Sequence, residues 1–216
     1  MKERPIIFSS EMVKAILDGR KTQTRRVLRK QPIDILPMNC PDMWVTLQTR
    51  DPNHGEVIGC RYGIPGDRLW VRETFLPDPP IDGWDGDFEW NGCGRPISGV
   101  PAHYRKPEHC LFAASWRGTP LTWRPSIFMP RWASRITLEI TGVRVERVQE
   151  ISEADAIAEG TTPSCVGDDL DYLKYRAGYM TLWDTINAER GFPWKSNPWV
   201  WVIEFKNVSE NQAVKL

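Results

Sequence analysis

The sequence predicts an α+β protein in which short helices flank a small mixed β-barrel. Short apolar or alternating runs, which are typical of strands, recur along the whole chain. One amphipathic run with helical period separates the first two of them. The last run, residues 199–205, is almost continuously apolar, which is expected of a strand covered on both faces.

The chain length is that of one domain. It has 216 residues, of which 41% are hydrophobic and 26% charged, as in ordinary globular proteins. We expect a single domain over residues 1–208, with loop-rich insertions at about 31–65 and 77–122. Residues 209–216 read as a polar tail.

The first strand is expected at residues 5–8 and is followed by a helix. Ser9 or Ser10 can cap this helix, because a serine side chain accepts hydrogen bonds from the first turn. Gly19 ends it, where positive φ is usually needed. Its apolar stripe has a spacing of 3.6 residues and consists of Met12, Val13, Ile16 and Leu17.

The next strands are expected near residues 44–47 and within 66–75. In the second of these, Leu69 and Val71 point one way, and the other face carries Arg68, Trp70 and Arg72. That polar face is either the wall of a ligand site or a packed cation–π ladder.

The second half of the chain predicts a long strand over residues 135–148, with a bulge or bend at Gly142. A short helix follows from Ser152 and ends at Glu159. A carboxylate in the last turn faces the unfavourable end of the helix dipole, so a cationic partner such as Lys21 would explain it. The alternative is a solvated glutamate. A further helix is expected over residues 168–190.

The chain is organised around residues 19–26, Gly-Arg-Lys-Thr-Gln-Thr-Arg-Arg. Lys21 can act as a general base only if burial or neighbouring positive charge lowers its pKa, and several arginines are close in sequence. The Thr24 hydroxyl needs such a base before it can act as a nucleophile. The alternative is a solvated basic turn that binds phosphate or nothing.

Charge and cysteine content limit the classes of function. The formal net charge is zero, so the whole protein is not an electrostatic binder of polyanions. We expect a cytosolic protein with free thiols, since the five cysteines are scattered and no long apolar run or signal peptide is present. No metal or other cofactor is expected, because the spacing of Cys93, His103, His109 and Cys110 matches no usual zinc pattern.

Eleven tryptophans suit either a β-rich core or a pocket that stacks a planar ligand. Residues 123–135 combine tryptophan with arginine between prolines, which predicts a rigid extended loop. Its arginines, Arg124, Arg131 and Arg135, could bind a phosphate or carboxylate, or pack over aromatic faces.

These motifs together resemble the ASCH domain, a family of PUA-like β-barrels. The resemblance rests on residues 19–26 after a helix, on residues 66–71, on 129–135 and on 197–205. The fuller pattern is similar to long ASCH proteins of phages and prophages, which implies the cytoplasm of a bacterial host. Relatives often carry His where Phe128 stands, so any role of that His is missing here.

The resemblance implies two functions. Some ASCH proteins hydrolyse the amide of N4-acetylcytidine, and their catalytic Lys, Thr and Glu match Lys21, Thr24 and Glu159. We therefore expect an amidohydrolase acting on an N4-acylated cytidine or a related modified nucleoside or nucleotide. The expected ligand-binding residues are Arg20, Arg25, Arg68, Trp70, Arg72, Arg131, Trp132 and Arg135. The alternative is a non-catalytic module that binds single-stranded RNA or a nucleotide; a third idea, a phage protein that binds a host factor, has no feature in its favour.

Overall fold

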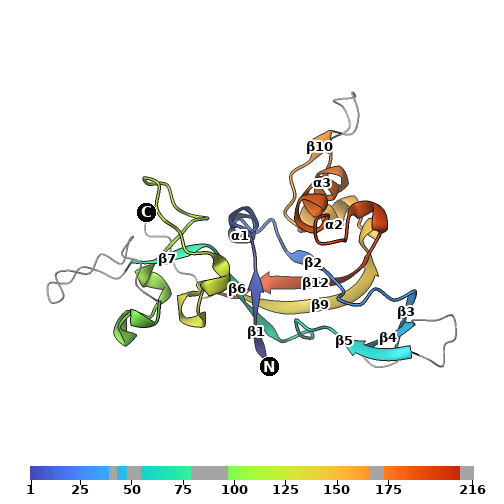
Figure 1. The fold of residues 1–216 in the computed structure, drawn as a ribbon, viewed down its shortest axis with the longest axis horizontal. Helices are drawn as coiled ribbons and strands as arrows, with labels where there is room; N and C mark the ends of the chain where they lie inside the picture. The colour runs from blue at the N-terminus through green and yellow to red at the C-terminus, as the bar shows by residue number, and fades with distance from the viewer. Residues whose placement is uncertain (39–42, 48–54, 79–96, 166–172, 210–216) are drawn as a thin grey trace.

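The computed structural model describes residues 1–38, 43–47, 55–78, 97–165 and 173–209. Its centre is a mixed five-stranded sheet with the order β1-β6-β9-β12-β2 (Figure 1). The pair β1 and β6 is parallel, and the other neighbours are antiparallel. The strands are β1 (Glu3–Ile7), β6 (Arg68–Arg72), β9 (Thr137–Arg147), β12 (Trp199–Asn207) and β2 (Gln23–Val27). The predicted α+β class is confirmed.

The two edge strands of this sheet, β1 and β2, are joined by helix α1 (Ser10–Leu17). The Ser9 hydroxyl accepts from the backbone N–H of Met12, and Gly19 follows the helix with φ of 72°. Arg26 on β2 donates from Nη2 to the carbonyl oxygen of Ile7, at 2.7 Å. In a closed barrel the edge strands β1 and β2 would be hydrogen-bonded to each other. Here the Arg26 side chain of β2 reaches the backbone of β1.

Strand β12, which lies between β9 and β2, is covered on both faces, as predicted. Trp201, Ile203 and Phe205 pack in a core with β1, β6, β9 and α1. Val200 and Val202 face the opposite core, which includes residues of α2 (Glu153–Ala158) and α3 (Tyr175–Asn187). Figure 1 shows these two helices over the β2 and β12 side of the sheet.

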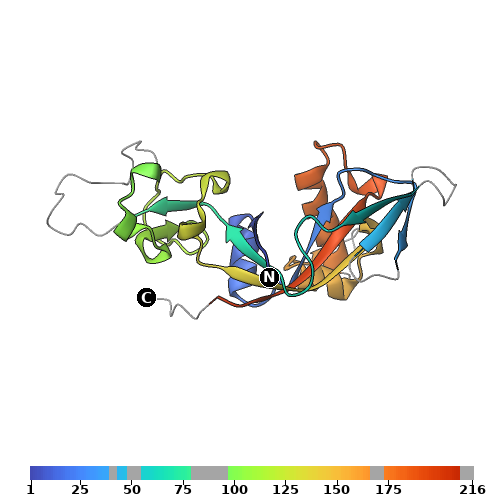
Figure 2. The same ribbon diagram turned by 90° about the horizontal axis from the view of Figure 1, so that it is seen from below.

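Both insertions contain strands. The first forms an antiparallel sheet of β3 (Asp34–Pro37), β4 (Met43–Leu47) and β5 (Gly55–Gly59), where the sequence indicated one strand. A ribbon of β7 (Phe75–Pro77) and β8 (Cys110–Phe112) belongs to the second. Figures 1 and 2 show this second region at the opposite end of the molecule from α2 and α3.

Three local predictions need correction. Leu17 is exposed and Ala15 is buried, whereas Met12, Val13 and Ile16 of the predicted stripe do pack against the core. Helix α3 begins only at Tyr175, after a short ribbon of β10 (Ser164–Cys165) and β11 (Leu173–Lys174); residues 166–172 of the predicted helix lie outside the described ones. The expected extended loop at 123–135 contains two single-turn 3-10 helices. Such turns occur at Ile97–Gly99, Ala102–Tyr104, Pro107–His109, Ser126–Phe128, Arg131–Ala133, Val148–Glu150 and Trp194–Ser196.

The bulge expected near Gly142 is present. Glu204 of β12 pairs with Gly142, but Phe205 pairs with Ile140, so the register shifts by one residue there. Most of the predicted polar tail, residues 210–216, lies outside the described part of the chain.

Candidate active site

The segment after α1 places Lys21 against the end of α2. The backbone N–H groups of Arg20 and Lys21 both donate to the carbonyl of Ala15, at 2.9 and 3.0 Å. Lys21 forms an isolated antiparallel bridge with Glu159, and the N–H of Thr22 donates to the carbonyl of Ala158 at 2.8 Å. The ends of two helices far apart in sequence are thus bonded together at this lysine.

Lys21 and Glu159 form a buried ion pair. Their side chains are only 2% and 5% exposed, and Lys21 Nζ lies 2.7 Å from Glu159 Oε2. Nζ also donates to the backbone carbonyl of Glu159 at 2.8 Å. The other carboxylate oxygen, Oε1, accepts from Arg25 Nη1 at 3.2 Å. One carboxylate therefore lies between two cations.

Arg25 is held by acids from β9 and α2. Its Nε donates to Glu146 Oε1 at 3.0 Å, and its Nη2 lies 3.4 Å from Asp155 Oδ2. Burial raises the pKa of Asp155, but hydrogen bonds from Gln23 and Ser152 and the charge of Arg25 outweigh burial and bring it to about 2. The network leaves Arg25 little freedom to turn away from Glu159.

Burial lowers the pKa of Lys21 below its ordinary value. The negative charge of Glu159 opposes this shift, and the positive charges of Arg26 and Arg25 add to it. This is the combination that a lysine needs to act as a base. In its neutral form Lys21 can donate two hydrogen bonds to Glu159 and keeps one lone pair on Nζ.

These groups line one cavity of about 560 Å³. Lys21, Thr24, Arg25 and Glu159 are among its polar lining residues, between the edges of the central sheet and α3. Its aromatic wall consists of Phe8, Tyr62, Tyr179, Trp183 and Phe192. A cavity of this size with an aromatic wall is typical of a small-molecule site.

Thr24 is buried on β2, where it pairs with Ile203 of β12. Within the described part of the chain, no hydrogen bond joins its hydroxyl to Lys21 Nζ. The structure thus brings together in one cavity all three residues that the resemblance implied as catalytic, with Lys21 bonded to Glu159 and not to Thr24.

The predicted ligand-binding residues are separated by the fold. Arg25 lines the cavity of Lys21, and Arg20 lines a neighbouring one. Neither cavity is lined by the other six, which are Arg68, Trp70, Arg72, Arg131, Trp132 and Arg135.

Those six residues have protein partners of their own. The guanidinium groups of Arg72 and Arg131 lie 5.5 and 6.0 Å from the Trp70 ring, so the packed cation–π alternative describes this face. Arg131 also binds Glu3, and Arg135 binds the buried Glu73 through two hydrogen bonds. Arg68 is half-buried beside Glu3, and Trp132 packs against the core around Phe75.

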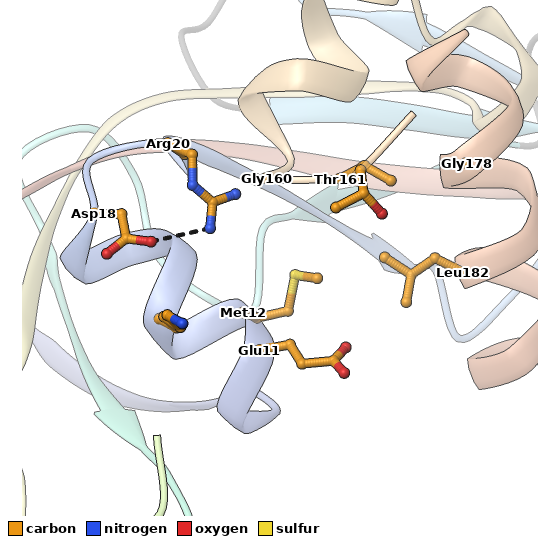
Figure 3. A pocket seen from close by; sticks show the side chains of 10 residues that line it. Glu11, Met12, Asp18, Arg20, Gly160, Thr161, Gly178 and Leu182 are labelled. Atoms are coloured by element: carbon orange, nitrogen blue, oxygen red, sulfur yellow. Dashed lines mark hydrogen bonds and ion pairs between the residues drawn. The ribbon is translucent and has the colours of Figure 1, made fainter. Parts of the chain in front are cut away.

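The neighbouring cavity, of about 410 Å³, lies between α1 and α3 (Figure 3). It shares Met12 and Leu182 with the cavity of Lys21. Arg20 points over it and is paired with Asp18 at 3.1 Å, and the buried Thr161 hydroxyl has no hydrogen-bond partner among the described groups.

Sequence reasoning missed most of the cavity wall. Tyr179, Trp183 and Asn187 were expected only as helix positions, and Arg61, Tyr62 and Arg190 were not singled out. A signal existed in Tyr179, Trp183 and Asn187, since a spacing of four residues places them on one face of α3. No comparable signal exists for Arg61 and Tyr62, which reach the cavity from the first insertion.

No family model matches the sequence, and no curated protein is detectably similar to it. Two solved structures are similar over 97% of this chain and 81% of their own. One is an ASCH domain from Lactobacillus crispatus JV V101, with 13% identity and a TM-score of 0.39. The other is a DUF984 protein from Enterococcus faecalis V583, with 12% identity and the same TM-score. Both likenesses are distant and carry no argument about function.

Two further findings concern the described residues alone. They contain no group of three or more His, Cys, Asp or Glu side chains that could hold a metal ion; Cys93 lies outside them. None of their helices is long and apolar enough to cross a membrane.

Proposed function

We propose that this chain is an amidohydrolase that acts on an N4-acylated cytidine nucleoside or nucleotide. The observation that carries the proposal is the buried Lys21–Glu159 pair, 2.7 Å apart, in the same cavity as Thr24. A lysine whose pKa is lowered by burial beside a carboxylate is suited to move protons near neutral pH.

In this mechanism neutral Lys21 accepts a proton from the Thr24 hydroxyl or from a water molecule in the cavity. The activated oxygen attacks the acyl carbon, and the bond from that carbon to N4 then breaks. Lys21, with Glu159 as its partner, returns the proton to the leaving N4 amine, so the products are the carboxylic acid and cytidine. If Thr24 is the nucleophile, its oxygen forms an ester with the acyl group, and one water molecule then hydrolyses this ester to release the carboxylic acid and free Thr24.

The aromatic wall suits the pyrimidine ring in this scheme. Tyr62 and Phe192 line the cavity from segments that are distant in sequence. Both are only half-buried, so they are available to a planar ligand.

The test is release of cytidine from N4-acetylcytidine by the purified protein, followed by chromatography. The Lys21→Met variant keeps the length of the side chain and removes its amine, and it should lose turnover while remaining folded. The control is Lys30→Met, since Lys30 is exposed and pairs with Glu56 outside the cavity. Turnover by Lys21→Met at the wild-type rate would contradict the mechanism. No release from this or any other N4-acylated cytosine would leave the binding module as the better hypothesis.

A further inference from the structure

The cavity around Lys21 is lined by far more positive than negative charge. Glu159 is its only acidic lining residue within the described chain. The cationic lining residues are Lys21, Arg25, Arg26, Arg29, Arg61 and Arg190. Since Glu159, Glu146 and Asp155 already neutralise Lys21 and Arg25, the excess charge belongs to the other four arginines.

None of these four arginines forms an ion pair with a described acid. Arg26 donates from Nη2 to the Ile7 carbonyl and lies over the Phe8 ring, 5.1 Å from its centroid. Arg190 donates from Nη1 to Asn187 Oδ1 at 3.2 Å, and Arg61 lies 5.4 Å from the Tyr62 ring. These contacts with neutral groups orient Arg26, Arg61 and Arg190 without cancelling their charge.

The four arginines come from three separate parts of the chain. Arg26 and Arg29 follow one another on and just after β2, Arg61 precedes β6, and Arg190 follows α3. Arg29, Arg61 and Arg190 are exposed at the cavity, whereas Arg26 is half-buried. Like charges brought together by the fold repel one another, and a bound anion removes that repulsion.

We propose that these four arginines form a subsite for a phosphate monoester, so that the ligand of the cavity is a nucleoside monophosphate and not a neutral nucleoside. The inference rests on the proposed function, because it names the substrate class for the same cavity. Arginine binds phosphate through paired N–H donors, and several arginines can share the two charges of a monoester. The volume of about 560 Å³ has room for both a base and a phosphate.

The test compares the binding of cytidine 5′-monophosphate and of cytidine by calorimetry at low and high salt. Neither ligand carries an acyl group, so the measurement does not depend on turnover. We expect the monophosphate to bind at least about tenfold more tightly at low salt, with the preference shrinking as salt rises. The Arg61→Gln/Arg190→Gln double variant should lose most of this preference and keep its affinity for cytidine. Equal binding of the two ligands by the wild type would overturn the proposal.

A matched control and a third ligand sharpen the result. Arg117→Gln removes an exposed arginine outside the cavity and should leave the preference unchanged. A preference that survives in the double variant would show that the phosphate binds elsewhere. A cytidine trinucleotide without a terminal phosphate should bind no better than cytidine. If it binds more tightly than the monophosphate and depends on the same arginines, the subsite takes the diester backbone of RNA and the monoester assignment is wrong.

Failure of this inference can be told apart from failure of the hydrolase. Hydrolysis of N4-acetylcytidine without a preference for the monophosphate would reject the phosphate subsite and keep the hydrolase. A preference that depends on the four arginines, without any amide hydrolysis, would reject the hydrolase and keep a nucleotide-binding protein.

Discussion

At the scale of single residues, the protonation of Lys21 is the property on which the proposed chemistry depends. Burial lowers its pKa, so the amine loses its proton below the ordinary value of 10.5. We expect kcat/KM to rise with pH to a plateau whose midpoint lies below 10.5. A pH–rate profile measured between about pH 5 and pH 10 checks this, and a flat profile would contradict the role of base.

The carboxylate of Glu159 sets where that midpoint falls. Its negative charge raises the pKa of Lys21 against the effect of burial. The Glu159→Gln variant keeps the shape of the side chain and removes the charge, so the midpoint should move to lower pH. Its plateau rate should fall about 10²-fold or more, because the proton relay to the leaving amine is lost. A midpoint that moves upward would contradict the electrostatic account of the pair.

Asp155 links the site to stability in acid. Its folded pKa of about 2 lies below the ordinary 3.8, so the carboxylate stabilises the folded state above about pH 4. This contribution is lost as the pH falls from about 4 to about 2. Asp155→Asn should lower the free energy of unfolding at pH 7 by about 1–2 kcal/mol, because it also breaks the cap with Ser152.

Urea denaturation of the wild type and of Asp155→Asn at pH 7 and at about pH 2.5 measures this difference. The two proteins should differ clearly at neutral pH and much less in acid. Asp18 is exposed and pairs with Arg20, which is not a partner of Asp155, so Asp18→Asn provides the control. An equal difference at both pH values would show that the carboxylate charge is not the cause.

At the scale of elements, the chain turn at Gly160 fixes the distance between α1 and α2. Gly160 has φ of 75°, and an added Cβ would lie 2.8 Å from Ala15 Cβ and 2.9 Å from Lys21 Cβ. Gly160→Ala should therefore displace Lys21 from Glu159 and reduce turnover by more than about 10-fold. Gly19→Ala is the matched control, because Gly19 has φ of 72° but nothing within 4 Å of its added Cβ.

Both substitutions should cost about 1–2 kcal/mol of stability from the left-handed backbone. Only Gly160→Ala should also lose activity per folded molecule, measured under conditions where both variants are fully folded. Equal activity in the two variants would show that the close packing of α1 and α2 does not position Lys21.

The elements differ in how well the sequence predicted them. Helix α1 and the strands β9 and β12 were predicted because their apolar period and caps are local signals. The pairing of Lys21 with Glu159 was expected from the poor placement of a carboxylate at a helix end. The rest of the cavity depends on which face of α3 meets β2 and on where the first insertion returns. Those are tertiary contacts between distant segments, which local patterns do not encode.

The arginine and tryptophan residues show the limit of composition as a guide. Arg131 and Arg135 were expected to bind ligand, yet they pair with Glu3 and Glu73. The cavity arginines without a described acidic partner are Arg26, Arg29, Arg61 and Arg190. Residue type alone does not show which arginines have acidic neighbours. Only the fold decides this, because each partner comes from a different strand or loop.

At the scale of the whole molecule, the cavity combines two edges of the central sheet with the helical layer. The ribbon of β7 and β8 lies at the other end and contributes no lining residue among those described. Its elements pack around their own core of Phe75, Phe112 and Met129. Ligand binding in the cavity is therefore expected to depend on the end of the molecule that contains α2 and α3, and not on the ribbon of β7 and β8.

The four cavity arginines should make the ligand-free protein less stable than it could be. Sites that hold like charges for a ligand reduce folding stability, and relieving that repulsion stabilises the fold. Arg61→Gln/Arg190→Gln should raise the Tm by about 1 °C at low salt, since exposed substitutions change stability by only a few tenths of a kcal/mol. The gain should vanish at high salt, where screening removes the repulsion.

Inorganic phosphate should raise the Tm of the wild type more than that of the double variant. Calorimetric scans at both salt concentrations measure all three effects. A double variant less stable than the wild type at low salt would show that these side chains support the fold and are not held together for an anion.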